Sequence, residues 1–163
     1  MDSAARKDAQ EKLAVSLLQG ESQPFFFPEG LLGFAAYRRF SLNRYQPGDG
    51  SESPFFLLQA LDGDLSFPLV SPHLLVPEYQ LVPSAETLVR LATDTLDDLV
   101  VLTIVTLRQR LEEITANLQG PLLLNPVARL GLQVIADRYS VRHPLILRQP
   151  STKKRPRPHG KKR

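Results

Sequence analysis

Apolar and polar residues alternate with a period of two along much of this chain, and turn-forming residues separate the alternating stretches. This period is typical of a half-buried β-strand. Residues 99–107 are instead almost wholly apolar and rich in Val, Ile and Thr, which predicts a buried central strand. We expect strands or extended segments at 13–17, 25–27, 39–42, 55–61, 65–70, 79–82, 99–107, 114–118, 122–124, 131–136 and 139–147.

Turn and helix signals lie between these segments. Asp62-Gly63-Asp64 stands between two apolar runs, which predicts a tight β-hairpin. Pro68 lies in the second strand of this hairpin and favours an edge or bulged strand there. One internal helix is expected after Ser84, a good N-cap residue, with Glu86 in its first turn and an apolar side made by Leu88, Leu91 and Ala92.

Many short strands separated by Pro and Gly predict an all-β, mainly antiparallel fold. We expect one compact domain, barrel-like or a sandwich, with one or two short helices. Residues 1–12 form a charged N-terminal lead, 13–147 the β domain, and 148–163 a polybasic tail. The tail lacks apolar anchors, and its composition predicts disorder.

The net charge of +3 conceals two oppositely charged parts. Eight of the twenty Lys and Arg residues, and no acid, lie in 148–163, so twelve bases face seventeen acids in 1–147. The body therefore carries −5, which suits a basic protein partner, because complementary charge speeds encounter. The tail reads most simply as a solvated extension; the alternative is weak, sequence-tolerant contact with RNA or another polyanion. The candidate contacts are Lys153, Lys154, Arg155, Arg157, Lys161, Lys162 and Arg163.

Catalytic and metal-binding chemistry finds little support in the sequence. The chain has no cysteine, and its three histidines, His73, His143 and His159, have no metal-ligand spacing. The nucleophile elbow Gly-x-Ser-x-Gly is also absent. We therefore expect no enzyme activity, no cofactor and no metal. Since no apolar run has spanning length and the first residues do not form a secretory signal, we also expect no membrane insertion and a cytoplasmic location.

Four separated segments together point to one family. They are Phe27-Pro-Glu-Gly-Leu-Leu-Gly-Phe34, residues 53–62 running on to Phe67 and Pro72, residues 114–126, and Tyr139-Ser-Val-Arg-His-Pro-Leu145. In this order and spacing they closely resemble the FliW family of bacterial flagellar assembly factors, over roughly residues 13 to 145. We refer to them below as signature segments one to four.

The resemblance implies a barrel-like β domain with short helices and a non-enzymatic regulator. Such a protein binds CsrA, a small RNA-binding dimer, and relieves its repression of flagellin translation. It also binds flagellin, so that secretion of flagellin frees it to capture CsrA. The competing hypothesis from the residues alone is a nucleic-acid-binding module, in which the barrel is the platform and the basic tail the clamp.

Candidate partner contacts fall into two groups. Asp62 and Asp64 would supply acidic charge to a basic partner. The other candidates are positions of the signature segments, most of which we expect to be structural, since a buried Asn, for example, has to be hydrogen-bonded and often pins a turn. These positions are Phe34, Asn117, Pro121, Asn125, Tyr139 and His143.

Overall fold

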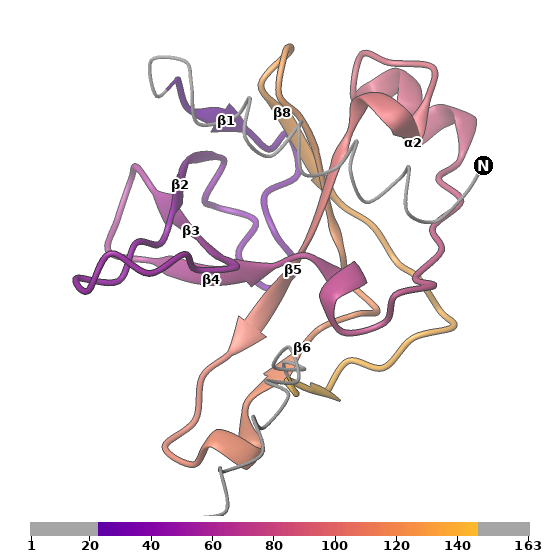
Figure 1. The fold of residues 1–163 in the computed structure, drawn as a ribbon. Helices are drawn as coiled ribbons and strands as arrows, with labels where there is room; N and C mark the ends of the chain where they lie inside the picture. The colour runs from indigo at the N-terminus through magenta and orange to yellow at the C-terminus, as the bar shows by residue number, and fades with distance from the viewer. Residues whose placement is uncertain (1–22, 147–163) are drawn as a thin grey trace, which may run out of the picture.

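Nine strands, one α-helix and three 3₁₀ turns make up residues 23–146, the part of the chain that this computed structural model describes (Figure 1). The strands are β1 (Phe25–Phe26), β2 (Arg39–Arg44), β3 (Phe55–Ala60), β4 (Ser66–Val70), β5 (Val100–Thr106), β6 (Thr115–Ala116), β7 (Leu122–Asn125), β8 (Leu130–Gln133) and β9 (His143–Pro144). The helical elements are η1 (Pro72–Leu74), α2 (Ala85–Arg90), η2 (Leu96–Asp98) and η3 (Leu111–Glu113).

Seven of the strands close into a barrel. Their order is β4-β3-β2-β1-β8-β7-β5, and pairing of β4 with β5 joins the two ends of this row. All pairings in the ring are antiparallel except that of β1 with β8. The predicted all-β, mainly antiparallel barrel is therefore confirmed. The remaining strands, β6 and β9, extend from the far end of β5 and project below the barrel in Figure 1.

β5 is the strand to which the rest of the fold attaches. It pairs with β4 on one side and with both β7 and β6 in its remaining registers. Three steps along β5, from Val105 to Leu102, correspond to six steps on the partner, from Ala116 to Leu122. The three surplus residues form a bulge over 117–121, which contains Gly120-Pro121 and redirects the chain between the two strands.

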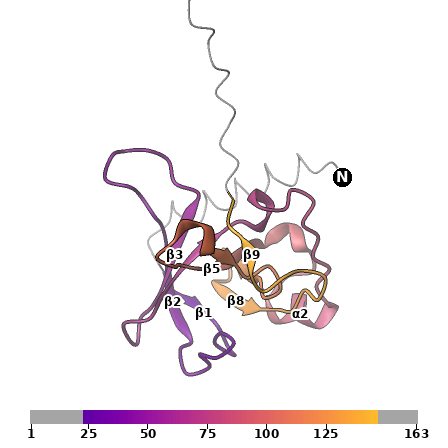
Figure 2. The ribbon, with the colours of Figure 1, turned by 90° about the horizontal axis from the view of Figure 1, so that it is seen from below.

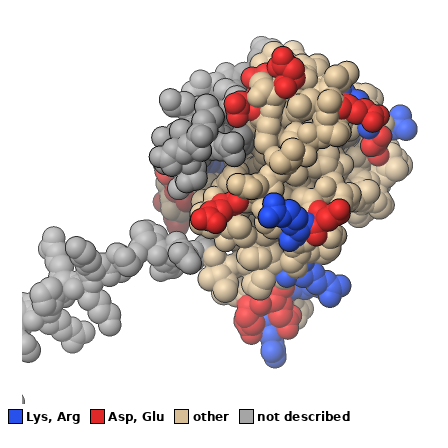
Figure 3. Space-filling model, turned by 90° about the vertical axis from the view of Figure 1, so that its right-hand side faces the viewer, with Lys and Arg blue, Asp and Glu red and all other residues tan. Residues whose placement is uncertain are grey.

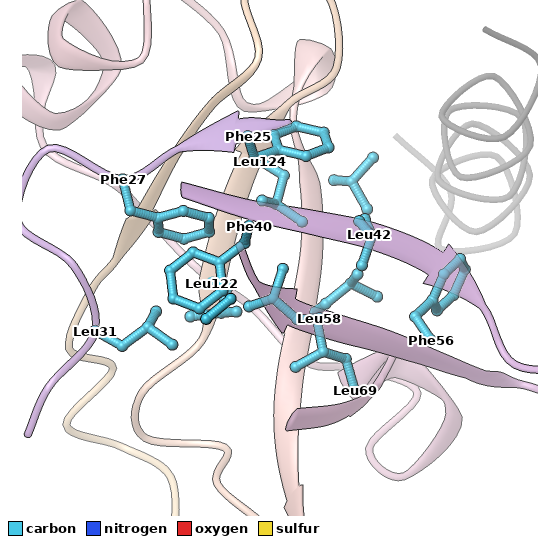
Figure 4. Packing of buried hydrophobic residues seen from close by; sticks show 13 residues of the cluster. Phe25, Phe27, Leu31, Phe40, Leu42, Phe56, Leu58, Leu69, Leu122 and Leu124 are labelled. Carbon is cyan, nitrogen blue, oxygen red and sulfur yellow. The ribbon is translucent and has the colours of Figure 1, made fainter. Parts of the chain in front are cut away.

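The barrel interior is filled by side chains rather than left as a cavity. Leucines and phenylalanines from six of the seven strands, all but β8, point toward one another there together with Phe27 and Leu31 (Figure 4). Phe27 and Phe40 meet edge to face, with ring centroids 5.2 Å apart. Gly131 makes room for this pair, because a Cβ built on it would stand 2.4 Å from the ring of Phe27. A filled interior is expected for a barrel of so few strands.

A second apolar layer covers one outer side of the barrel. The outward residues of β5 and β7, including Val101 and Leu123, pack beneath α2 and the non-strand segments that follow β4 and β8. In Figure 2 this covered side carries α2, while β2 and β3 lie on the opposite side. Strand alternation explains the division, since successive side chains of β5 enter the interior and the outer layer in turn.

Helix α2 begins and ends at defined caps. The Ser84 side chain accepts a hydrogen bond from the Thr87 N–H, as the sequence predicted. At the other end, the Thr93 N–H donates to Leu88 O and the Ala92 N–H to Val89 O, which is the Schellman pattern. Ala92 adopts φ 56° in this motif. The prediction that Ala92 continues the apolar side of the helix is thus wrong, because it is the left-handed residue that ends it.

Two other predictions need correction, and three lie outside the described residues. Residues 79–82 are not a strand: the Tyr79 N–H closes a turn on Val76 O at 2.9 Å, and the Tyr79 phenol donates to Leu118 O at 2.8 Å. β4 is an edge strand only as far as Pro68, because Leu69 and Val70 pair with β5 as well as β3. The strand expected at 13–17, the N-terminal lead and the basic tail fall outside residues 23–146.

The row of paired strands ends at β9, which pairs with β6. Most N–H groups around this last strand already have acceptors. Arg142 N–H donates to Ser140 Oγ at 3.1 Å, Leu145 N–H to Ile114 O at 3.0 Å, and Ile146 N–H to Pro144 O at 3.0 Å. Pro144 has no N–H.

Candidate functional site

Signature segments one and three meet at the side chain of Gln133. Its Oε1 accepts the Leu32 N–H at 2.8 Å, and its Nε2 donates to Gly120 O at 2.9 Å. The Gly120 N–H donates in turn to Asn117 Oδ1 at 3.0 Å. β1 pairs with β8 only at Phe26 and Leu130, so Gln133 supplies by its side chain the link that the backbone does not make further along β8.

The turn carrying Leu32 is rigidly built. The Phe34 N–H donates to Leu31 O at 2.8 Å, and Gly33 at the third position has φ +82°, as a type II turn requires. Gly30 has φ +63°, and a Cβ there would lie 2.8 Å from the Cα of Ala35. Only glycine fits such a position. Segment one therefore has a fixed shape, with Leu31 buried and Leu32 on the outside.

Segment one also packs on segment two. The rings of Phe34 and Phe67 meet edge to face at 5.2 Å. Tyr37 lies against the β3–β4 turn, where a Cβ on Gly63 would come within 3.0 Å of the Tyr37 ring. Phe34 is thus partly structural and partly accessible, since it packs on Phe67 and remains 38% exposed.

Segments three and four meet around two tyrosines. Tyr79 O–H donates to Leu118 O at 2.8 Å, and Tyr139 Oη accepts the Gln80 N–H at 2.8 Å. The two rings lie 4.3 Å apart. Burial raises the pKa of the Tyr79 phenol well above its ordinary value, and the neighbouring Tyr139 phenol adds to the effect. This tyrosine therefore stays neutral and serves as a hydrogen-bond donor in the fold.

Asn125, Asn117 and Pro121 have structural contacts. Asn125 Nδ2 donates to Leu91 O at 2.7 Å, and its Oδ1 accepts the N–H groups of Val127 and Ala128. It therefore ties the β7–β8 turn to the end of α2. Asn117 closes the bulge described above, and Pro121 O accepts the Val134 N–H at 3.0 Å.

Asp62 and Asp64 lie in the predicted hairpin turn, but their charges differ in setting. Asp62 forms an exposed ion pair with Arg39, whose Nη2 lies 2.6 Å from Asp62 Oδ1. The hydrogen bond to Asp62, together with its negative charge, raises the pKa of the Arg39 guanidinium. Asp64 is in no ion pair between residues of the described part of the chain. The hairpin is therefore less acidic than its sequence suggests.

His143 lies on β9 opposite Ala116, within segment four. Within residues 23–146, no group of three or more His, Asp or Glu residues could hold a metal ion. The same residues include no helix long and apolar enough to cross a membrane.

Charge is distributed unevenly over the surface. Figure 3 shows acidic side chains alone at the top left of the described part of the face that carries α2, and acidic and basic side chains next to one another at its upper right, centre and bottom. Residues 23–146 contain thirteen acids, nine arginines and no lysine. Only two ion pairs, Arg39–Asp62 and Arg90–Glu29, form between described residues. Most of the acidic charge is thus available to a partner.

Exposed apolar side chains occur near the residues that the Gln133 link joins. Leu32 is 61% exposed, and Ile135, two residues after Gln133, is 58% exposed. Leu31, next to Leu32 in this turn, is instead buried in the barrel interior. Neither Leu32 nor Ile135 was singled out from the sequence, and neither were Gln133 and Tyr79. The sequence did contain one indication for Leu32, which is its place in a turn between Gly30 and Gly33.

Comparison with known proteins gives a consistent result. The sequence profile of the FliW protein family matches residues 9–145. The chain is 34% identical to the flagellar assembly factor FliW of Natranaerobius thermophilus over 130 residues, which cover 77% of this chain and 83% of that protein. It is 36% identical to the FliW of Carboxydothermus hydrogenoformans over 131 residues, covering 78% and 81%. A crystal structure of the flagellar assembly factor FliW superposes with a TM-score of 0.64 at 28% identity, covering 78% of this chain and 87% of that one.

Proposed function

The chain belongs to the FliW family of flagellar assembly factors, and from this premise we propose that it is a protein-binding antagonist of the translational regulator CsrA that also binds flagellin. The observation that carries the proposal is the family match over residues 9–145, which includes all four signature segments. The protein acts by binding alone, in the cytoplasm, without a cofactor.

Partner exchange is the regulatory step in this proposal. Flagellin occupies the protein while it accumulates, and its export leaves the protein free to bind CsrA. CsrA then no longer binds the flagellin mRNA. The size of this response is set by the difference in affinity between the two partner states, since a ligand shifts an equilibrium only by its differential binding.

The charge of the described body supports a basic partner. RNA-binding proteins carry Lys and Arg to neutralise phosphates. Thirteen acids against nine arginines in residues 23–146 give the body a field of the opposite sign. Such a field raises the association rate and makes it fall with salt.

Size-exclusion chromatography with light scattering tests the proposal directly. The protein and its host's CsrA are mixed with and without residues 148–163, at two salt concentrations. We expect both forms to co-elute with CsrA, and monomeric flagellin to displace CsrA from the complex. If neither protein co-elutes with either form, the proposed function is wrong.

The basic tail separates this proposal from the nucleic-acid-binding alternative. That alternative requires RNA binding by the isolated protein, lost on deleting residues 148–163. If CsrA binds only when the tail is present, the contact is driven by the charge of the tail. That result would weaken the proposal that the β domain itself binds CsrA.

Charge reversal in the β3–β4 turn examines the acidic surface more finely. We expect Asp64→Lys to slow association with CsrA at low salt, because this carboxylate is in no ion pair with another described residue. Asp62→Lys changes the charge of the turn by the same two units and should slow association by a similar factor, while it also removes the ion pair with Arg39. An unchanged association rate for both variants would place the CsrA contact elsewhere on the body.

A further inference from the structure

We propose that the loop joining β5 to β6 is a site of self-association, at which two copies of this chain meet about a two-fold axis. We call residues 107–114 the arm. The inference goes beyond the proposed function and does not depend on it, since contact between two copies needs neither CsrA nor flagellin.

The arm stands away from the barrel, at the end of the part of the sheet formed by β5, β6 and β9. Thr106 pairs with Thr115 at its base. The Leu145 N–H donates to Ile114 O at 3.0 Å, so the residues after β9 support the returning side of the arm. In Figure 1 the arm is the lowest described part of the molecule. A second copy can therefore reach it without bringing the two barrels together.

The tip of the arm is held by two turn hydrogen bonds. The Glu113 N–H donates to Arg110 O at 3.0 Å, and the Ile114 N–H donates to Leu111 O at 3.2 Å. The side chain of Leu111 is nevertheless 80% exposed, and that of Leu107 is 64% exposed. A preshaped apolar surface loses little conformational freedom when a partner covers it, and its burial favours association.

The charges of the arm follow a definite order along the chain. Arg108 and Arg110 come before Glu112 and Glu113, so the arm carries two bases, two acids and no net charge. All four side chains are exposed, and none is in an ion pair between described residues. The lowest described part of Figure 3 shows acidic and basic side chains next to one another. The arm thus presents a basic half and an acidic half, both open to a partner.

This order of charges fits a second copy better than a partner of one sign. A uniformly basic or acidic surface would be attracted by one half of the arm and repelled by the other. About a two-fold axis, residue i of one copy meets residue j of the other and j meets i, so the basic half of each copy lies on the acidic half of the other. An axis through Leu111 brings the two Leu111 side chains together and sets Arg110 of each copy beside Glu112 of the other.

The contact surface is small, so we expect weak and reversible association. Stable interfaces use about 20–30 residues from each partner, against eight in the arm. Residues 23–146 also carry thirteen acids against nine arginines, and this charge of one sign opposes the approach of two bodies. Dimers should therefore form only at high protein concentration.

The test uses the full chain with charge reversals on the arm, studied by sedimentation equilibrium over a wide range of concentrations. We expect Arg110→Glu and Glu112→Arg each to weaken self-association roughly tenfold or more, because both contacts across the axis then join like charges. Arg38→Glu and Glu52→Arg are the controls, since they make the same changes of charge at exposed positions outside the arm. Both controls should self-associate as the wild type does.

Mixing the two arm variants gives the sharper result. In the mixed dimer, the new acid of Arg110→Glu faces the new base of Glu112→Arg, and the remaining Glu112 of the first faces the remaining Arg110 of the second. Both contacts across the axis again join opposite charges. We expect the mixture to dimerise in the concentration range of the wild type, although neither variant does so alone.

The outcomes separate this inference from its alternatives. A wild-type protein that stays monomeric at every concentration overturns it, and so does a dimer that both arm variants leave unchanged. Weakening in both variants without recovery in the mixture overturns the two-fold arrangement. A dimer lost on deleting residues 148–163 but retained in the arm variants would assign the contact to the tail instead. Thermal unfolding of each variant checks that the fold is retained. Because no CsrA or flagellin is present, failure of the proposed function would leave these results unchanged.

Discussion

The barrel interior and the layer outside β5 and β7 are both well-buried apolar cores, yet they are held together differently. The interior is enclosed by strands on all sides, and its walls are fixed by backbone ladders. The outer layer is covered by α2, by η1 and η2, and by extended segments without ladders of their own. Its covering segments therefore need other means of attachment.

Those means are side chains that bond to backbone groups. The Tyr79 O–H donates to Leu118 O at 2.8 Å, and Asn125 Nδ2 donates to Leu91 O at 2.7 Å. Each joins segments more than thirty positions apart in the chain. The comparison shows that the alternation of apolar and polar residues along the strands is enough to specify a closed sheet. A layer without strands depends instead on a few individual polar residues. Substitutions in the two regions should therefore have different costs.

The largest effect is expected inside the barrel. Phe40→Ala removes a wholly buried ring that packs edge to face on Phe27, leaving a cavity that the closed wall cannot collapse. We expect a loss of about 3 to 5 kcal/mol in the free energy of unfolding, measured by urea denaturation. Phe26→Ala, at a 43% exposed ring on β1, is the control and should cost clearly less. Equal costs would show that the interior is not the more sensitive core.

The next effect is expected at the attachment of α2. Asn125→Ala leaves Leu91 O and two turn N–H groups without their partner. Losing buried hydrogen bonds of this kind costs about 2 to 3 kcal/mol in all. Asn43→Ala, at an exposed strand position, should change the free energy of unfolding by less than about 0.5 kcal/mol. A cost as small for Asn125 would mean that α2 is held by apolar contact alone.

A smaller effect, with a pH signature, is expected at Tyr79. Tyr79→Phe removes the hydrogen bond to Leu118 O and should cost about 1 to 2 kcal/mol at neutral pH. Because burial raises the pKa of the phenol above its ordinary value of 10.0, the unfolded chain ionises first. The contribution is therefore complete below pH 10 and is lost as pH rises beyond it.

The stability curves of the wild type and Tyr79→Phe should thus converge above that pH, as followed by urea denaturation at several pH values. Tyr45→Phe, at a 53% exposed ring, should run parallel to the wild type throughout. If the curve of Tyr79→Phe instead runs parallel to that of the wild type at all pH values, ionisation of Tyr79 does not limit its contribution to stability.

The smallest effect has the opposite sign. Ala92 ends α2 with φ 56°, a conformation that glycine adopts without strain. We expect Ala92→Gly to raise the free energy of unfolding by about 0.5 to 1 kcal/mol. Ala85→Gly, at the first position of the same helix, should lower it. A loss at both positions would show that Ala92 tolerates its conformation at no cost.

The contrast between the two cores also explains what could be predicted from the sequence. The alternation of apolar and polar residues predicted the barrel strands to within a few residues, because the residues that pair with neighbouring strands are also the ones whose side chains fill the core. The segment 79–82 was misread as a strand, since Tyr79 is buried by one ring contact and one phenol hydrogen bond rather than by alternation. The prediction for Ala92 was wrong because a Schellman motif requires a residue with positive φ, and an alanine in the sequence gives no indication of that conformation.

The candidate site was predictable only in part. The four segments were found as sequence motifs, but the meeting of segments one and three at Gln133 depends on the closure of the barrel, which no local pattern contains. Asp62 and Asp64 were correctly placed in a turn, whereas the ion pair of Asp62 with Arg39 joins residues 23 positions apart. Leu32 and Ile135 look like core residues in a sequence and become surface residues only in the fold.

The last strand in the row has a consequence for how partners can be recognised. Around β9, Pro144 has no N–H, and the N–H groups of Arg142 and Ile146 are already donated within the chain. A foreign peptide cannot extend the sheet here by main-chain zippering, a mode of binding that accepts many sequences. Any ligand at this end has to be read through its side chains. Single substitutions in such a ligand should therefore weaken binding more than they would in a peptide held by main-chain hydrogen bonds.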